Sequence, residues 1–308
     1  MEVIFYMNLM NWLIVLGLPV VPKPIVGAFA HRYIAGDELK DAVRVVKDLN
    51  SKGMCATMDL LGEHSNRKED AVRATETYLE ILNTIQKESL DSNVSLKPTQ
   101  LGMGIDPEFC YQNIRRIVEH AKGQKNFVRI DMEDHPYTTL TLDIYHRLHQ
   151  EIDNVGVVIQ AYLRRTADDI IRLKEVKANL RLCKGIYVEP RAISYRDREI
   201  IRLNYTWLME QLLKNGNYLG IATHDELLVY EATRIIRDLK LTPNQYEFQM
   251  LLGVDEALRE IILSGGHKLR VYVPFGKEWY AYSTRRLKEN PQMAGYVIKQ
   301  VFGLDKKK

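Results

Sequence analysis

Residues 55–97 decide the fold: they read CATMDLL at 55–61, AVRATETYLEILNTI at 71–85 and VSLK at 94–97. The first and third segments are short apolar runs. The middle segment places apolar residues at three- and four-residue steps. This pattern predicts a strand, an amphipathic helix and a second strand. A strand–helix–strand unit is typical of a parallel sheet.

The same alternation continues along the chain and gives eight apolar runs, spanning roughly 250 residues with the helices between them, the usual size of a (βα)8 barrel. The runs are Cys55–Leu61, Val94–Lys97, Phe127–Met132, Val155–Tyr162, Leu180–Lys184, Leu219–Thr223, Tyr246–Leu251 and Leu269–Pro274. Further helices are expected at Asp37–Asn50, ended by Gly53, at Asn113–Ala121 and at Lys277–Asn290. We therefore predict a distorted TIM-type (βα)8 barrel over 46–308. An apolar, helical arm over 1–45 precedes it, and a final helix caps its active site.

Composition limits the class of protein. The 308 residues are 46% hydrophobic and 27% charged with a net charge of +3, as in a soluble globular protein. The only Lys/Arg run is the tail Lys306-Lys307-Lys308, so no nucleic-acid partner is expected. Three cysteines without metal-ligand spacing, Cys55, Cys110 and Cys183, indicate a reducing compartment, and the cytoplasm is expected.

The N-terminal stretch Leu9–Val21 is apolar but contains Pro19 and is shorter than the ~20 residues that a membrane span needs. No Lys or Arg precedes it, unlike in a signal peptide. We interpret it as an arm that packs on the barrel, with peripheral contact to a membrane surface as the alternative.

In such a barrel the active site lies at the carboxyl ends of the strands. Two lysines stand there, Lys97 and Lys184, and a buried lysine needs an anion or a carboxylate partner. Either lysine is also a candidate Schiff-base nucleophile. After the last run comes Arg285-Arg286, a pair suited to a carboxylate if its helix caps the site, and otherwise a surface feature.

The sequence contains neither a metal-binding cluster nor a dinucleotide-binding fingerprint. The histidines lack the spacing of a metal cluster, so no metal is expected, and Gly102 and Gly104 lack the third glycine of a dinucleotide fingerprint. Aromatic residues that could wall an apolar ligand are Tyr187, Phe248, Tyr272 and Tyr282. From the residues alone, the barrel mouth suits a small carboxylate with an apolar body.

These strand ends resemble the proline dehydrogenase family, from about Tyr33 onward. The most specific segments are YVPFG at 272–276 and YSTRRLKE at 282–289. Others in the family's order are LGE at 61–63, LKP at 96–98, IDME at 130–133, QAY at 160–162, RLCKG at 181–185, ATHD at 222–225 and EFQ at 247–249. The resemblance implies a monofunctional, FAD-dependent enzyme that oxidises L-proline to 1-pyrroline-5-carboxylate by hydride transfer from C5.

The resemblance also implies site residues. The proline carboxylate would pair with Lys97, Arg285 and Arg286, while Tyr272 and Tyr282 would pack on the ring and Asp131 would hold the cationic cluster. Tyr187 would contact both substrate and cofactor. Near the flavin N5 and O4 edge we expect Gln160 and Arg181; the remaining cofactor contacts would be Asp131, Lys184, Gly185, Thr223, His224 and Glu289.

Partners follow from the same resemblance. Electrons would pass to membrane quinone, and the arm would aid peripheral association. A chain of 308 residues leaves no room for an aldehyde dehydrogenase domain, so a separate pyrroline-5-carboxylate dehydrogenase would take the product. The alternatives are a hydroxyproline-preferring relative, a Schiff-base aldolase and a non-catalytic carboxylate-binding barrel; Tyr282, expected to crowd ring C4, favours plain proline.

Overall fold

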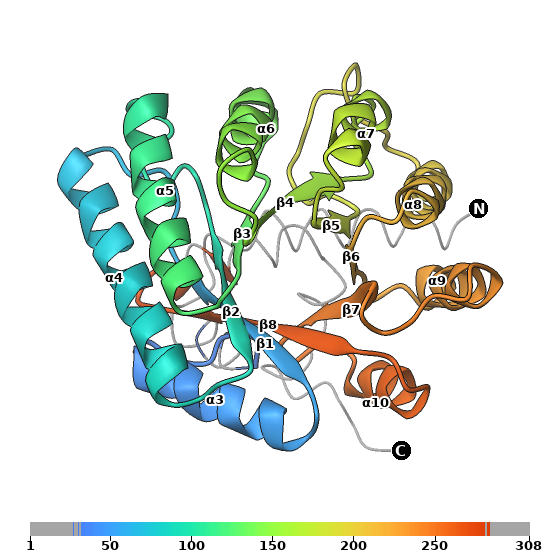
Figure 1. Cartoon of the computed structure of the whole chain (residues 1–308), viewed down its shortest axis with the longest axis horizontal. Coiled ribbons are helices and arrows are strands. Elements are labelled where there is room, and N and C mark those ends of the chain that lie inside the picture. Colours follow the sequence, from blue (N-terminus) through green and yellow to red (C-terminus); the bar gives the residue numbers. More distant parts are fainter. Residues whose placement is uncertain (1–26, 28–29, 31, 281, 284–308) are drawn as a thin grey trace, which may run out of the picture.

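The computed structural model describes residues 27, 30, 32–280, 282 and 283. Its centre is a closed barrel of eight strands in sequence order (Figure 1). The strands are β1 (Cys55–Leu60), β2 (Ser92–Leu96), β3 (Val128–Ile130), β4 (Val155–Gln160), β5 (Leu180–Cys183), β6 (Leu219–Ala222), β7 (Tyr246–Leu251) and β8 (Leu269–Phe275). Every neighbouring pair is parallel, and β8 pairs with β1 to close the ring.

Helices surround the strands (Figure 1). Those that lie wholly in the described part of the chain are α3 (Leu39–Ser51), α4 (Lys68–Lys87), α5 (Pro107–Gly123), α6 (His135–His149), α7 (Thr166–Glu175), α8 (Arg198–Lys214), α9 (Glu226–Asp238) and α10 (Glu256–Ser264). All but α3 follow a strand. Helix α3 packs on β1 and β8, so it covers the seam where the barrel closes.

Burial explains why the strands form continuous apolar runs and the helices have apolar residues at three- and four-residue steps. Strands of a barrel are covered on both faces and therefore form near-continuous apolar runs; all six residues of β4 are buried. An outer helix is covered on one side only. In α4 the buried residues include Ala71, Tyr78, Ile81 and Ile85, which lie on one stripe facing the sheet. The main hydrophobic core thus joins barrel and helices.

The predicted barrel is confirmed, and each of the eight apolar runs contains most or all of one strand. One difference is at β3, which ends at Ile130 although the apolar run continues to Met132. Met132 is buried after the strand has ended, so its apolarity reflects packing and not sheet pairing.

The proposed arm 1–45 and the capping helix Lys277–Asn290 fall largely outside the described residues, and the division at residue 45 stays a prediction. Among the described helices, none has the length and hydropathy of a membrane span.

Candidate active site

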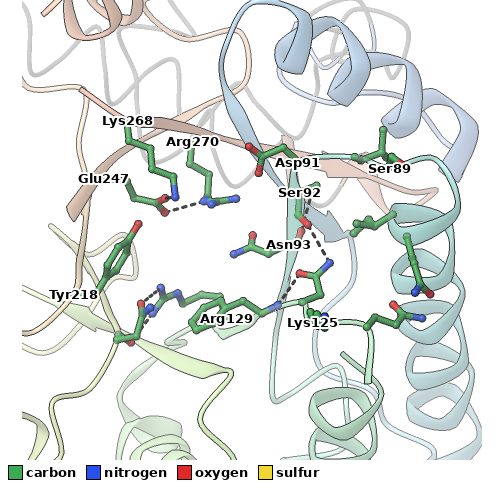
Figure 2. A pocket seen from close by; sticks show the side chains of 17 residues that line it. Ser89, Asp91, Ser92, Asn93, Lys125, Arg129, Tyr218, Glu247, Lys268 and Arg270 are labelled. Carbon is green, nitrogen blue, oxygen red and sulfur yellow. Dashed lines mark hydrogen bonds and ion pairs between the residues drawn. The ribbon is translucent and has the colours of Figure 1, made fainter. Parts of the chain in front are cut away.

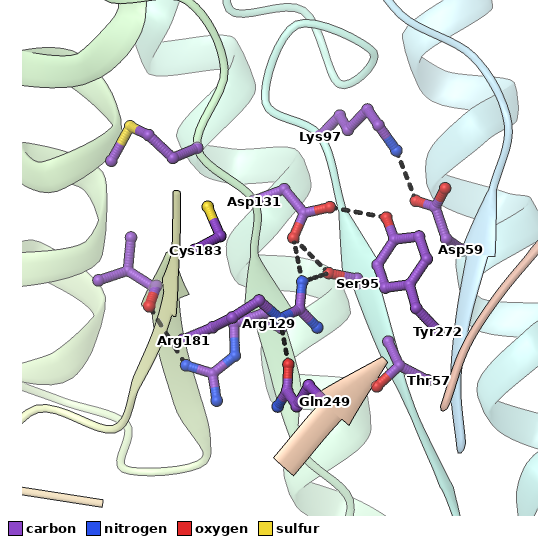
Figure 3. A network of polar contacts seen from close by, with 12 residues as sticks. Thr57, Asp59, Ser95, Lys97, Arg129, Asp131, Arg181, Cys183, Gln249 and Tyr272 are labelled. Atoms are coloured by element: carbon purple, nitrogen blue, oxygen red, sulfur yellow. Dashed lines mark hydrogen bonds and ion pairs between the residues drawn. The ribbon is translucent and has the colours of Figure 1, made fainter. Parts of the chain in front are cut away.

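Lys97 follows β2 and forms an ion pair with Asp59 of β1, with Nζ 2.6 Å from Oδ1 (Figure 3). The lysine is 6% exposed and the aspartate 0%. Burial works against the ammonium form, but the charges of Asp59 and Asp131 outweigh it and raise the pKa of Lys97. Lys97 is therefore protonated. This state disfavours the hypothesis of a Schiff-base aldolase with Lys97 as nucleophile, because only a neutral amine attacks a carbonyl.

Asp131, just after β3, is the centre of a second cluster (Figure 3). Its Oδ1 accepts hydrogen bonds from Ser95 Oγ at 2.6 Å and Arg181 Nη1 at 2.7 Å, and its Oδ2 accepts one from the Tyr272 hydroxyl at 2.8 Å. The Arg181 guanidinium also lies over the Tyr272 ring, 5.2 Å from its centroid. Asp131 was expected to hold the cationic cluster of Lys97, Arg285 and Arg286. In the structure its direct partner is Arg181, and the acid bonded to Lys97 is Asp59.

Gln249 of β7 extends this cluster into the barrel. Arg181 Nε donates to Gln249 Oε1 at 2.5 Å, and Gln249 Nε2 donates to Glu247 Oε1 at 2.6 Å. Gly220 on the neighbouring strand makes room, because a Cβ there would lie 2.4 Å from Gln249 Nε2. Glu247 and Gln249 belong to the motif EFQ at 247–249, and the sequence predicted no role for either residue. Glu247 is the second residue of β7, so it lies at the opposite end of the strand from the active-site mouth.

A cavity of about 510 Å³ adjoins the Lys97 pair. Its lining includes Leu61, Glu63, Lys97 and Tyr282, so the structure brings two of the predicted substrate contacts together. Tyr282 is 8% exposed and packs in a small apolar cluster with Ile34 and Leu61. This cavity combines the Lys97 ammonium and the Tyr282 ring with three carboxylates, those of Glu63, Asp70 and Glu278.

On the other side of the mouth, Lys184 and Arg202 share the carboxylate of Asp225. Lys184 Nζ donates a hydrogen bond to Asp225 Oδ2, and Arg202 Nε donates one to the same oxygen at 2.7 Å. Burial would raise the pKa of Asp225, but hydrogen bonds from Arg202 and Lys184 outweigh it and lower that pKa. Arg202 also forms an ion pair with the exposed Glu199, so the two cations face two carboxylates, and Lys184 and Arg202 keep N–H groups of the kind that bind a phosphate group.

Three further residues that were predicted to contact the cofactor are Gln160, Gly185 and His224. Gln160 is buried and donates to Met132 O at 3.2 Å, while its Oε1 has no hydrogen-bond partner in the described part of the chain. Leu251 N donates to His224 Nε2 at 3.1 Å. Gly185 has φ of +108°, and a Cβ there would lie 2.0 Å from the Tyr162 ring, so this turn requires glycine.

The other predicted residues are placed less fully. Thr223 is buried and its hydroxyl accepts from Asp225 N at 3.1 Å, while Tyr187 is half-buried after β5. Arg285, Arg286 and Glu289 lie outside the described residues. No group of three or more His, Cys, Asp or Glu side chains is arranged for a metal within the described ranges.

Comparison with known proteins assigns the barrel. A family model described as proline dehydrogenase matches residues 42–299, which include every strand and the whole candidate site. The chain belongs to the proline dehydrogenase family. It is thus an enzyme of proline oxidation in proline catabolism, and membership implies a flavin cofactor.

Individual relatives agree with the family. Proline dehydrogenase 1 of Bacillus subtilis subsp. natto is 38% identical over 88% of this chain and 90% of the relative. Proline dehydrogenase of Deinococcus radiodurans is 33% identical over 87% and 88%, respectively. The crystal structure of proline utilization A (PutA) from Bdellovibrio bacteriovorus, inactivated by N-propargylglycine, superposes with a TM-score of 0.82 at 24% identity. It covers 98% of this chain, which spans 38% of that longer protein, and supports the fold.

Proposed function

We propose that this enzyme oxidises L-proline to 1-pyrroline-5-carboxylate at the carboxyl end of the barrel, with FAD as the flavin. The observation that carries the proposal is the cavity shared by Lys97 and Tyr282, beside the cluster of Asp131, Arg181 and Tyr272. A fixed cation and an aromatic wall match the two chemical parts of proline, a carboxylate and an apolar ring.

The carboxylate would be held by Lys97 together with Arg285 and Arg286. Lys97 and Arg181 each already face a carboxylate, so the pairs they form carry little net charge. Additional positive charge is needed to bind an anionic group in this buried place. The two arginines supply it in the planar geometry that suits a carboxylate. Tyr272 and Tyr282 would contact the ring and direct C5 toward the cofactor.

The residues at the mouth fit a flavin dinucleotide. Gln160 Oε1 offers a buried acceptor, and Lys184 and Arg202, which share Asp225, offer charged N–H donors to a pyrophosphate. The remaining contacts proposed are Asp131, Arg181, Gly185, Tyr187, Thr223, His224 and Glu289. When bound, FAD would accept the hydride at N5. Arg181 would place a positive charge beside that position, and Asp131 and Gln249 hold its guanidinium from two sides.

Proton balance restricts the roles of the cations. Proline must lose an N–H proton and the C5 hydride for the C5=N bond to form. Lys97 is held in its protonated form and arginine remains protonated, so neither Lys97 nor Arg181 is suited to accept the ammonium proton. Their role is to bind and orient.

The cellular location, the electron acceptor and the downstream enzyme are proposed as the sequence predicts them. We propose a cytoplasmic enzyme that passes electrons to membrane quinone and releases its product to a separate pyrroline-5-carboxylate dehydrogenase. Peripheral membrane contact through Leu9–Val21 is tested by deleting the arm, and unchanged partitioning with lipid vesicles would rule it out.

The test of the proposed function is a visible absorbance spectrum of the purified protein before and after anaerobic addition of L-proline. Flavin bands that bleach with proline are expected. A flavin that stays oxidised would refute proline as substrate, and a protein that stays colourless after incubation with FAD would refute the cofactor.

Tyr282→Ser should shift substrate preference from proline toward hydroxyproline, since it removes bulk beside ring C4. An unchanged preference would contradict that contact.

A further inference from the structure

A second cavity, of about 500 Å³, lies at the opposite end of the barrel (Figure 2). Its lining comes from residues at the amino ends of the strands, among them Ser92, Arg129, Tyr218, Lys268 and Arg270. Nothing in the proposed oxidation of proline uses this space, because the active site of such a barrel lies at the carboxyl ends.

Arg129 of β3 is 2% exposed, yet its contacts are to neutral groups. Nη1 donates to Asn179 O at 2.7 Å and Val157 O at 3.3 Å, and Nη2 donates to Asn179 Oδ1 at 2.6 Å. Its Nε has no hydrogen-bond partner in the described part of the chain. Burial, and then the charge of Arg181, lowers the pKa of Arg129 to about 9. A buried guanidinium of this kind is stabilised by an adjacent anion.

Glu247 does not supply that anion to Arg129. Arg270 Nε donates to Glu247 Oε1 at 2.8 Å, and Lys268 Nζ lies 3.5 Å from Oε2. In Figure 2, Glu247 and Arg270 lie across the space from Arg129. The lining residues include four cations, Lys125, Arg129, Lys268 and Arg270, against two carboxylates, Asp91 and Glu247. The cavity therefore carries a surplus of positive charge.

The neighbouring strand leaves room for this guanidinium. Gly156 of β4 lies against it, and a Cβ there would be 2.3 Å from Arg129 Nη1. The arginine thus occupies a space that the barrel provides, with its side chain fixed by two carbonyls and an amide oxygen.

We propose that this cavity is a binding site for a small oxyanion, distinct from the proline site. Arg129 and Lys268 are the main contacts: Arg129 lines the cavity with a buried guanidinium that has no carboxylate partner, and Lys268, only loosely paired with Glu247, can turn toward a ligand. A phosphate group suits this positive charge and fits within the cavity.

The experiment titrates inorganic phosphate into the flavin-loaded protein by isothermal titration calorimetry in chloride buffer. Lys268→Met and Arg129→Gln are each expected to weaken phosphate binding by about tenfold or more, as for loss of a charged partner in a buried site. Lys214→Met is the matched control, because Lys214 ends α8 at the same end of the barrel without lining the cavity. It should bind phosphate like the parent protein.

A second arm separates this cavity from the active site. Saturating cyclopentane carboxylate, which resembles proline without the ring nitrogen, should leave the number of phosphate ions bound per chain unchanged. The proposal is overturned if the parent protein does not bind phosphate, if the carboxylate competes with it, or if Lys268→Met binds as tightly as Lys214→Met. Since Lys268 is half-exposed, its variant provides a result even where Arg129→Gln fails to fold.

Discussion

At the scale of single residues, the fully buried Asp59 is the direct counter-charge of Lys97. Asp59→Asn should lower the free energy of unfolding by about 3–5 kcal/mol, because it leaves a buried ammonium without its ion-pair partner. Lys97→Met in the same chain should recover part of that loss. Urea denaturation of the parent, both single variants and the double variant measures it, and strictly additive effects would contradict the pairing.

Glu133 gives a pH-dependent prediction. It is 1% exposed and accepts from Thr99 N at 2.8 Å and Thr99 Oγ1, yet burial raises its pKa from 4.5 to about 7. A carboxyl whose pKa is higher in the folded state binds more protons there, so its contribution to stability is present below pH 4.5 and is lost as pH rises to about 7.

Glu133→Gln removes that titration. The difference in unfolding free energy, variant minus parent, should be on the order of 3 kcal/mol larger at pH 8 than at pH 4.5, since one pKa unit is about 1.4 kcal/mol. Denaturant titrations at both pH values measure this difference. Parallel pH profiles for the two proteins would show that the pKa of Glu133 does not differ between the folded and unfolded states.

Arg285→Met tests the proposed carboxylate contact. Losing a desolvated charge partner costs about 2–5 kcal/mol, so the apparent affinity for proline should fall by well over tenfold while flavin content is kept. Steady-state kinetics and the flavin absorbance of the same sample provide both values. Unchanged proline affinity would remove Arg285 from the site.

At the scale of elements, most of the barrel was predictable because strand and helix periods differ and strands of a barrel are apolar on both faces. Helix α5 begins at Pro107, six residues before its predicted start at Asn113, because its first turn is specified by a cap and not by apolar spacing. The capping residue, Asp106, accepts from Glu108 N at 2.9 Å and Phe109 N at 3.3 Å.

Asp106→Ala should therefore lower the free energy of unfolding by about 0.5–2 kcal/mol, the usual cost of losing an N-cap. Asp134→Ala is the control. Asp134 stands at the same position of α6, also before an early proline, but makes no side-chain capping bond. Thermal unfolding compares them; an Asp134→Ala loss as large as that of Asp106→Ala would mean that helix charge, and not the capping bond, is responsible.

The candidate site was predictable by residue type and strand end, but not by partner. Pairing of Lys97 with Asp59, or of Arg181 with Gln249, depends on the register and twist of strands far apart in sequence. Arg129 and Arg270 sit inside apolar runs, and that position was the available signal for the second cavity. A charge within a strand buried on both faces has to face other polar groups.

At the scale of the whole molecule, polar contacts run through the barrel interior from one end to the other. Tyr272 and Arg181 bind Asp131, Gln249 joins Arg181 to Glu247, and Glu247 binds Arg270. Ion pairing and hydrogen bonds outweigh burial and lower the pKa of Glu247 to about 2, so it is ionised at neutral pH. The active site and the second cavity are thus connected through shared side chains.

This connection predicts energetic coupling between the two ends. Tyr272→Phe and Glu247→Gln share no direct contact in the chain of hydrogen bonds, yet their combined effect on unfolding free energy should differ from the sum by about 0.5 kcal/mol or more, as within one network. Tyr205→Phe is the matched control, because the buried Tyr205 hydroxyl donates to Leu182 O at 2.8 Å, outside these contacts. Tyr205→Phe combined with Tyr272→Phe should be additive. Denaturant unfolding of the two cycles decides: equal additivity in both would mean that Gln249 separates the two ends and does not couple them.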